Sequence, residues 1–302
     1  MPTVNDGAEP AKSAQGLALD DVGLLSGVVV VDRLRTLGGQ LLDLHEHVAR
    51  FCRSAQLLGI DLPSQQKLRD RVTACVEAEQ ECYVGDDFCV VLLATPGRIS
   101  SPIDPDTQSR TPTLIIHTQP IDWRRLAHWY RSGQALQVAT ARSVPAMCWS
   151  PKIKTRARLH YYLADQQAVN STNDPYAAGL LLDERGCVTE TSSANVLLVE
   201  GERLVSPQPA GILDGISLGR TVRLAMQLDV EVSWEDISIE RALQADGILL
   251  CGSTGCLWSA LQLNERVFKL PQQQPLLLRL WNAWQRDVAC DFLSPADIAA
   301  KR

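Results

Sequence analysis

The chain has 302 residues, of which 45% are hydrophobic and 21% charged, and its formal net charge at pH 7 is -6. This length accommodates one large core or two smaller ones, and the composition is ordinary for a globular protein, so two domains are expected. The acidic balance provides no basic face for nucleic acid. No apolar run approaches the roughly 20 residues of a membrane span, so the sequence predicts neither a nucleic-acid nor a membrane partner.

The N-terminal residues are polar, and the cysteines follow no pairing pattern. Residues 1–15 have no apolar block and no positive leader, so we expect residues 1–20 to form a disordered tail rather than a signal peptide. Nine cysteines are scattered without a CxxC pair, and most lie in apolar runs. This pattern favours free buried thiols over disulfides or a zinc site, and therefore a cytoplasmic location.

The first third of the chain predicts a compact α+β unit. A β-rich run at 28–37, broken by two glycines and continued to residue 44, predicts a hairpin. Apolar residues with helical spacing predict a helix over 45–58, and Ser64 is a suitable N-cap for a second helix that ends near residue 81. Two more strands are predicted at 88–94 and 113–117. We assign residues 21–121 to this unit, a small α/β domain.

After Pro120 the pattern changes to many short strands with few helices. Strands are predicted at 136–141, 179–182, 188–190, 196–199, 203–205, 247–251 and 257–263. Helices are predicted at 123–130, 155–167, 217–228 and 275–292. Such a succession predicts a strand-rich, barrel-like domain over residues 122–302.

Two lysines are the first candidates for chemistry. Lys152 and Lys154 lie in the segment Pro-Lys-Ile-Lys-Thr-Arg-Ala-Arg-Leu at 151–159. A lysine amine that loses its proton can attack a carbonyl group and then transfer protons as a general acid or base. Arginine cannot replace it, because the guanidinium does not deprotonate. The residues by themselves leave both lysines as candidates.

An acid and two turns of small residues follow. Glu190, 36 residues after Lys154, precedes Thr-Ser-Ser-Ala-Asn, so we expect it where a strand meets a tight turn that Asn195 stabilises. The segment 211–217, Gly-Ile-Leu-Asp-Gly-Ile-Ser, opens the predicted helix 217–228 with free backbone N–H groups, which bind phosphate well. A second turn of small residues, Gly-Ser-Thr-Gly at 252–255, follows the strand predicted at 247–251.

Together with Leu-His-Glu-His-Val-Ala-Arg-Phe-Cys-Arg-Ser-Ala at 44–55, these segments resemble the class IV (fold-type IV) pyridoxal 5'-phosphate (PLP) enzymes. That family contains branched-chain aminotransferases, D-amino acid aminotransferases and 4-amino-4-deoxychorismate lyases. The resemblance covers roughly residues 24 to 265. It implies a small α/β sandwich followed by a larger pseudo-barrel domain, with PLP bound between them, and a homodimer.

The resemblance also implies roles for individual residues. Lys154, which precedes a helix as in the D-amino acid aminotransferase and lyase groups, would form the Schiff base and transfer protons. Glu190 would keep the pyridine nitrogen protonated, and Arg50 would bind the phosphate. The implied cofactor-binding set is Arg50, Glu190, Asn195, Leu213, Gly215, Ile216, Ser217, Ser253 and Thr254. The residue that would contact the cofactor O3' stays open among Tyr161, Tyr162 and Arg158. The residue that would bind the substrate carboxylate stays open among Arg33, Arg35 and Arg98.

Two activities and one inactive alternative fit this pattern. The first is an aminotransferase that moves an amino group between a small amino acid and a 2-oxo acid. The second is a lyase that eliminates pyruvate from 4-amino-4-deoxychorismate. The residue pairs Arg158-Leu159 and Ala194-Asn195 resemble the sequence of that lyase. The branched-chain signature Gly-Gly-Asn-Tyr is absent after the lysine. A non-catalytic relative would not need the lysine, acid, arginine and both turns. No metal site is expected, because His45 and His47 face opposite sides of a helix without an HExxH spacing.

Overall fold

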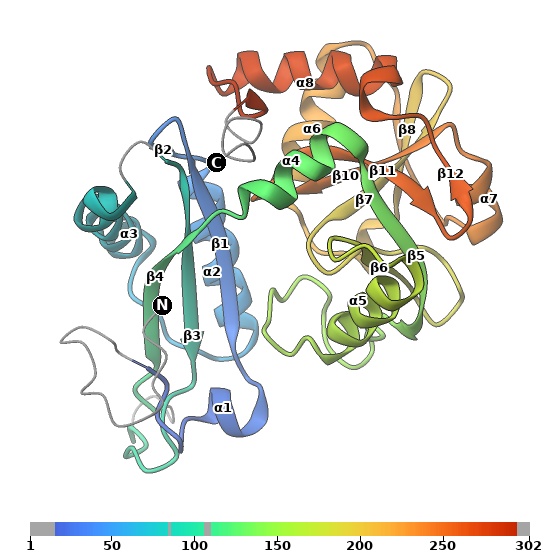
Figure 1. Cartoon of the computed structure of the whole chain (residues 1–302). Coiled ribbons are helices and arrows are strands. Elements are labelled where there is room, and N and C mark those ends of the chain that lie inside the picture. The colour runs from blue at the N-terminus through green and yellow to red at the C-terminus, as the bar shows by residue number, and fades with distance from the viewer. Residues whose placement is uncertain (1–15, 84–85, 106–109, 295–302) are drawn as a thin grey trace.

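The computed structural model describes residues 16–83, 86–105 and 110–294. It contains two sheets, one from the N-terminal part of the chain and one from the remainder (Figure 1). The change from one to the other lies between β4 (Thr113–Pro120) and α4 (Trp123–Ser132), beside the predicted boundary at 121–122. We therefore propose that residues 21–121 and 122–302 are two domains, called below the small and the large domain.

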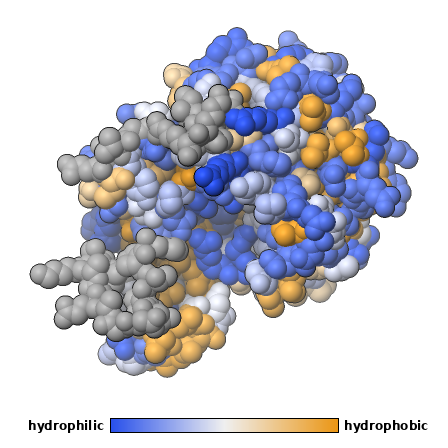
Figure 2. All heavy atoms as spheres, viewed as in Figure 1, coloured by the Kyte–Doolittle hydropathy of each residue, from blue (hydrophilic) through white to orange (hydrophobic). Residues whose placement is uncertain are grey.

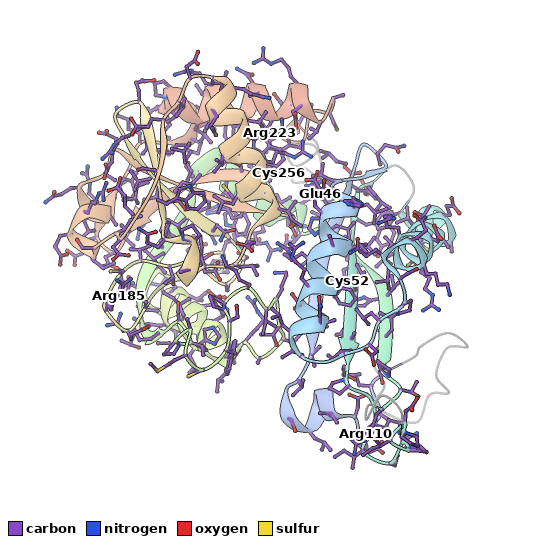
Figure 3. The ribbon with its side chains drawn as sticks, turned by 180° about the vertical axis from the view of Figure 1, so that it is seen from behind. Glu46, Cys52, Arg110, Arg185, Arg223 and Cys256 are labelled. Carbon is purple, nitrogen blue, oxygen red and sulfur yellow. The ribbon has the colours of Figure 1, made fainter. Side chains whose placement is uncertain are left out.

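The small domain is an antiparallel sheet with two helices on one face. Its strands run in the order β2-β1-β3-β4. Val30 and Leu34, alternate residues of β1, pack against Val48 and Phe51 of the first helix. Figure 3 shows this helix, with Cys52 on it, in front of the sheet. The elements not bounded above are α1 (Val22–Ser26), β1 (Val30–Leu37), β2 (Gln40–Leu41), α2 (Leu44–Leu57), α3 (Gln65–Glu79) and β3 (Phe88–Thr95).

The large domain is built on an eight-stranded mixed sheet. The strands follow the path β6-β5-β11-β10-β7-β8-β9, and β12 pairs with β11. The strand-rich domain predicted from the sequence is therefore confirmed. Its sheet is not a closed barrel, because β6 and β9 are the two ends of the strand path. The strands are β5 (Gln134–Arg142), β6 (Ala178–Leu182), β7 (Asn195–Glu200), β8 (Arg203–Pro207), β9 (Val232–Glu235), β10 (Gly247–Gly252), β11 (Cys256–Leu263) and β12 (Arg266–Val267).

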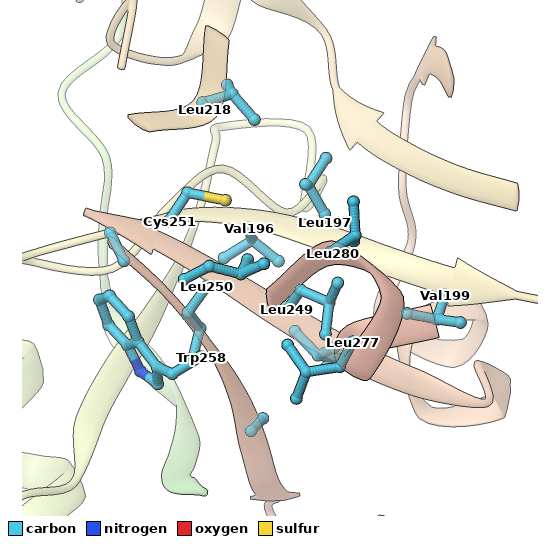
Figure 4. Packing of buried hydrophobic residues seen from close by; sticks show 14 of the residues in the cluster. Val196, Leu197, Val199, Leu218, Leu249, Leu250, Cys251, Trp258, Leu277 and Leu280 are labelled. Atoms are coloured by element: carbon cyan, nitrogen blue, oxygen red, sulfur yellow. The ribbon is translucent and has the colours of Figure 1, made fainter. Parts of the chain in front are cut away.

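Its core lies between the central strands and the helices that cover them. β6 and β10 are buried along their whole length, which explains their unbroken apolar runs. Figure 4 shows Leu249 of β10 beside Leu277 and Leu280 of the last helix. The indole of Trp258 stacks on that of Trp129, with ring centroids 4.7 Å apart. The helices of this domain are α4, α5 (Leu159–Thr172), α6 (Ile216–Gln227), α7 (Ile239–Gln244) and α8 (Pro275–Asp287).

Several predicted elements differ from the observed ones. The helix expected from residue 155 begins at Leu159, because the preceding residues pair with β1: Thr155 bridges Val30, and Arg156 N donates to Val29 O at 2.9 Å. The strand expected at 188–190 is reduced to isolated bridges. The last helix ends at Asp287 rather than at 292. α1, α7, β9 and β12 were not predicted, because each has at most six residues and too little periodicity.

The expected tail lies mostly outside the described residues. At its described end, Asp20 accepts a hydrogen bond of 2.9 Å from Arg98 Nε, so residue 20 is bound to the loop after β3. In the described ranges, none of the helices is long and apolar enough to cross a membrane.

Candidate active site

A cavity between the two domains gathers most of the predicted site residues. It is lined by Arg50 from α2, by Lys154 and Glu190, and by the start of α6. Figure 2 shows the surface hollowed between the two domains, with hydrophilic side chains around the hollow. The small domain reaches the cavity through α2, because three polar residues of that helix, His47, Arg50 and Ser54, share one buried face.

Lys154 is held by its backbone and lines the cavity. Its N–H donates to Ser54 Oγ at 3.1 Å, and its carbonyl accepts from Val31 N at 2.9 Å. Burial, and next the positive charge of Arg50, lower the pKa of the amine from 10.5 to about 8. About a tenth of the amine is therefore neutral at pH 7, far more than for an ordinary lysine, and the neutral amine is the form that a nucleophilic lysine requires.

Lys152 is used differently. Its ammonium donates to Asp214 Oδ1 at 2.6 Å, to Ile212 O at 3.1 Å, and to Pro209 O. All three of its N–H donors are thus engaged. The geometry favours Lys154 as the reactive lysine, because Lys154 lines the cavity and Lys152 does not.

Glu190 lies beside the lysine and is surrounded by donors. The Tyr161 hydroxyl donates to its Oε1 at 2.6 Å, and its Oε2 accepts from Asn195 Nδ2 at 3.0 Å and from Leu213 N at 3.2 Å. Burial raises the pKa of Glu190, while the hydrogen bonds from Tyr161 and Leu213 and the charge of Lys154 oppose that rise. Asn195 also donates to Leu213 O at 3.1 Å, so it joins the acid to the loop before α6.

The start of α6 is open to an anion. Gly215 is its N-cap and supplies no side-chain cap, so the N–H groups of Ile216 and Ser217 point to the cavity side of the helix start. A β-carbon at Gly215 would overlap the Asn195 amide oxygen, which explains the glycine. Ser253, from the turn after β10, lines the same cavity.

Arg50 is positioned by a buried acid that the sequence analysis did not identify. Asp32 accepts from Arg50 Nε and Nη2, both at 2.8 Å, and Nδ1 of His47 lies 2.7 Å from the same carboxylate. Burial alone would raise the pKa of Asp32, but the charges of Arg50 and His47 outweigh it and hold the pKa well below its usual range. The third nitrogen, Nη1, donates to Asp214 O at 3.0 Å across the domain boundary.

Four predicted residues lie away from the cavity lining. The hydroxyl of Thr254 lies 3.8 Å from Cys89 Sγ, and its carbonyl accepts from Arg35 Nη1 at 2.6 Å. Arg35 is 1% exposed and also contacts Asp87. Arg98 is held by Asp20. Arg33 lies on β1, and its Nε is buried without a hydrogen-bond partner among the described residues.

The candidates for the cofactor O3' separate in the structure. Tyr161 contacts Glu190, and Arg158 stacks on the Tyr161 ring at 4.4 Å and donates to Ser192 O. Tyr162 is 61% exposed and is not in the cavity lining. Ser54 and Asp32 were missed as site residues, although Ser54 belongs to the segment on which the resemblance rested.

The residues present fit PLP. A half-buried amine, a half-buried carboxylate and an uncapped helix start with a nearby arginine would meet the cofactor's aldehyde, pyridine nitrogen and phosphate, respectively. Across the described ranges, no group of three or more His, Cys, Asp or Glu side chains is placed to hold a metal ion.

Comparisons with known proteins identify the family of the chain. Residues 29–263 match the family model for amino-transferase class IV. The chain is 24% identical over 285 residues to branched-chain-amino-acid aminotransferase-like protein 2 of Arabidopsis thaliana. This alignment covers 94% of the chain, which spans about half (49%) of that longer relative.

Two solved structures share the fold. One is the branched-chain amino acid aminotransferase from Thermobaculum terrenum in its PLP form, with a TM-score of 0.77, 20% identity, and coverage of 92% of this chain and 91% of that one. The other is a proposed 4-amino-4-deoxychorismate lyase from Legionella pneumophila, with a TM-score of 0.76, 20% identity, and coverage of 91% and 97%. The fold-type IV architecture is confirmed, and the chain belongs to the class IV aminotransferases, a family of enzymes.

Proposed function

We propose that this protein is a PLP-dependent aminotransferase that moves an amino group between a small amino acid and a 2-oxo acid. The observation that carries the proposal is the pairing of Lys154, whose amine has a pKa of about 8, with the carboxylate of Glu190 in one cavity. When bound, PLP supplies an aldehyde that carries the amino group and a ring that withdraws electrons from the substrate Cα.

Each site residue of the chain has its own role in binding the cofactor or moving protons. The Lys154 amine binds the cofactor and, when free, moves the proton at the substrate Cα. Glu190 holds a proton at the pyridine nitrogen, and Asn195 and Leu213 hold Glu190 in place. The phosphate would be bound by the N–H groups of Ile216 and Ser217 and by the side chains of Arg50 and Ser253. Gly215, whose N–H is bonded to Leu213 O, leaves the helix start free of a capping side chain.

We assign the substrate carboxylate to Arg33. All three candidate arginines lie outside the cavity lining, but Arg35 and Arg98 already have acidic partners, whereas the buried Nε of Arg33 has no hydrogen-bond partner among the described residues. Arg33 stands near Arg156, and Arg156 follows Lys154 along the segment that pairs with β1. Burial, and then the charges of Arg158 and Arg33, lower the pKa of Arg156, which indicates a cluster of positive charge. Such a cluster attracts a carboxylate.

A second copy of the chain and a cytoplasmic location complete the proposal. Large apolar side chains are exposed on α1 and on the adjoining segments: Leu19, Leu24, Leu25, Ile99 and Ile103. Figure 2 shows hydrophobic surface at the lower edge of the small domain. Such a patch supports a homodimer, which light scattering in solution tests. All nine cysteines are free thiols, which supports a reducing compartment.

Two measurements test the activity. Borohydride reduction of the PLP-loaded protein followed by peptide mass spectrometry should place the cofactor on Lys154, and the label should be lost in Lys154→Ala; a label on Lys152 would reverse the assignment. A panel of amino donors with 2-oxoglutarate and pyruvate should give transamination. The fold shared with the Legionella pneumophila protein favours the lyase as the second candidate, and pyruvate release from 4-amino-4-deoxychorismate without transamination would select it.

A further inference from the structure

One lysine outside the cavity lining joins the two loops that frame the cavity. Lys152 lies two residues before Lys154, and its ammonium contacts a carboxylate and two backbone carbonyls in the loop that precedes α6. Between these lysines, Ile153 packs against the core of the small domain. The segment 152–154 therefore touches the large-domain loop, the small-domain core and the cavity with three successive side chains.

The loop before α6 carries three contacts of the candidate active site. Leu213 N donates to Glu190, and Leu213 O accepts from Asn195. Asp214 O accepts from Arg50 Nη1. Apart from the short 3-10 turn Pro209–Gly211, the loop has no regular structure before α6, so side-chain contacts add to its few local backbone hydrogen bonds in holding it. The loop thus contacts both the acid and the phosphate-side arginine.

We propose that Lys152 is a positioning residue that locks the loop 209–215, and through it sets the orientation of Glu190 and Arg50. The Lys152 side chain is 30% exposed and that of Asp214 is 57% exposed, so solvent screens the ion pair. The two carbonyl contacts are therefore expected to carry most of the effect, since each joins the ammonium to a backbone group that is part of the loop itself.

Hydrogen–deuterium exchange of the full-length, PLP-free protein tests the lock directly. The amides of Gly211, Leu213 and Gly215 donate to Gln208 O, Glu190 and Leu213 O, respectively. Loss of a charge-assisted contact should make their exchange faster by about tenfold in Lys152→Met. The matched control is Lys67→Met, on the exposed side of α3, which should leave this peptide unchanged.

The expected pattern is local. Exchange in β3 peptides should stay at the wild-type rate in Lys152→Met, and Lys152→Arg, which keeps a cation with several donors, should restore most of the protection. Equal acceleration in β3 would show general loosening of the protein and overturn the proposal, as would unchanged exchange over 209–215. If Lys152→Met does not fold, Lys152→Gln decides, since its shorter, uncharged side chain stays polar but cannot make all three contacts. Faster exchange confined to 209–215 supports the lock, and exchange at the wild-type rate overturns it.

The consequence for the cofactor rests on the proposed function and is measured separately. PLP affinity should fall about tenfold in Lys152→Met, while the covalent link to Lys154 still forms at saturating PLP. Because the exchange experiment contains no PLP, a protein that shows the local change but binds no PLP would contradict the proposed function alone. Unchanged PLP affinity together with faster loop exchange would overturn the link from the loop to Glu190 and Arg50.

Discussion

The hydroxyl of Tyr161 donates a hydrogen bond of 2.6 Å to Oε1 of Glu190, and this bond joins α5 to the candidate acid of the active site. Burial, and then the negative charge of Glu190, raise the pKa of Tyr161 well above its ordinary value of 10, so the tyrosine stays a donor at neutral pH. The same bond opposes the rise that burial causes in the pKa of Glu190. The tyrosine thus helps to keep the carboxylate ionised.

Tyr161→Phe should weaken catalysis without expelling the cofactor. Removing a hydrogen bond to a carboxylate costs about 1.5–3 kcal/mol, or about 10- to 150-fold. Since that bond lowers the pKa of Glu190, its loss should move the acid limb of the rate–pH profile to higher pH. Tyr162→Phe is the matched control, because that neighbouring ring is 61% exposed. Equal effects of the two substitutions on the profile would contradict the role given to Tyr161.

Lys154 should make the stability of the PLP-free protein depend on pH above neutrality. Its pKa is about 8 in the folded protein and 10.5 in the ordinary state, so the unfolded chain binds more protons between these values. The free energy of unfolding therefore rises with pH across this interval. Relative to Lys154→Met, the wild type should carry a penalty of up to about 3 kcal/mol at pH 7 that disappears toward pH 10.5. Denaturant unfolding of both proteins at several pH values measures it, and a constant difference would refute the lowered pKa.

Glu190→Gln should retain bound PLP and lose most of its turnover, because a neutral amide cannot stabilise the protonated pyridine nitrogen. The substitution preserves the shape of the side chain, so the hydrogen bond from Leu213 can remain. Steady-state rates and PLP content are measured together. Glu184→Gln, in an exposed turn, is the control. Near-normal catalysis in Glu190→Gln would mean that the acid opposite the pyridine nitrogen lies elsewhere.

PLP affinity should fall by different amounts when each of three residues that the sequence analysis assigned to the cofactor is replaced. Arg50→Lys should weaken PLP affinity about 10- to 150-fold, because it loses the fork but keeps a cation beside the buried Asp32. Ser253→Ala should cost less, and Thr254→Val should have little effect, because the Thr254 hydroxyl is directed to Cys89. PLP titration gives the affinities. A Thr254→Val loss as large as that of Arg50→Lys would contradict the observed orientation.

The sequence by itself determined the succession of elements and the residue types available for chemistry. The helix at 45–58, the strands at 88–94 and 113–117, and the small-residue start of α6 depend on periodicity and turn residues, which act within a few positions along the chain. For the same reason Arg50, Glu190 and the two lysines could be selected as candidates. Short elements such as α7 were not predicted, because its six residues contain little periodic signal.

Only the tertiary structure decided where each candidate lies and what it contacts. Lys152 and Lys154 are two residues apart, yet one is bound to the loop before α6 and the other lines the cavity. Ser253 and Thr254 are adjacent and face different surroundings. The deciding partners are distant in sequence: Ser54 lies 100 residues from Lys154, and Asp214 lies 164 residues from Arg50. Burial and pairing across such separations set the pKa values and orientations, and local sequence pattern contains no information about them.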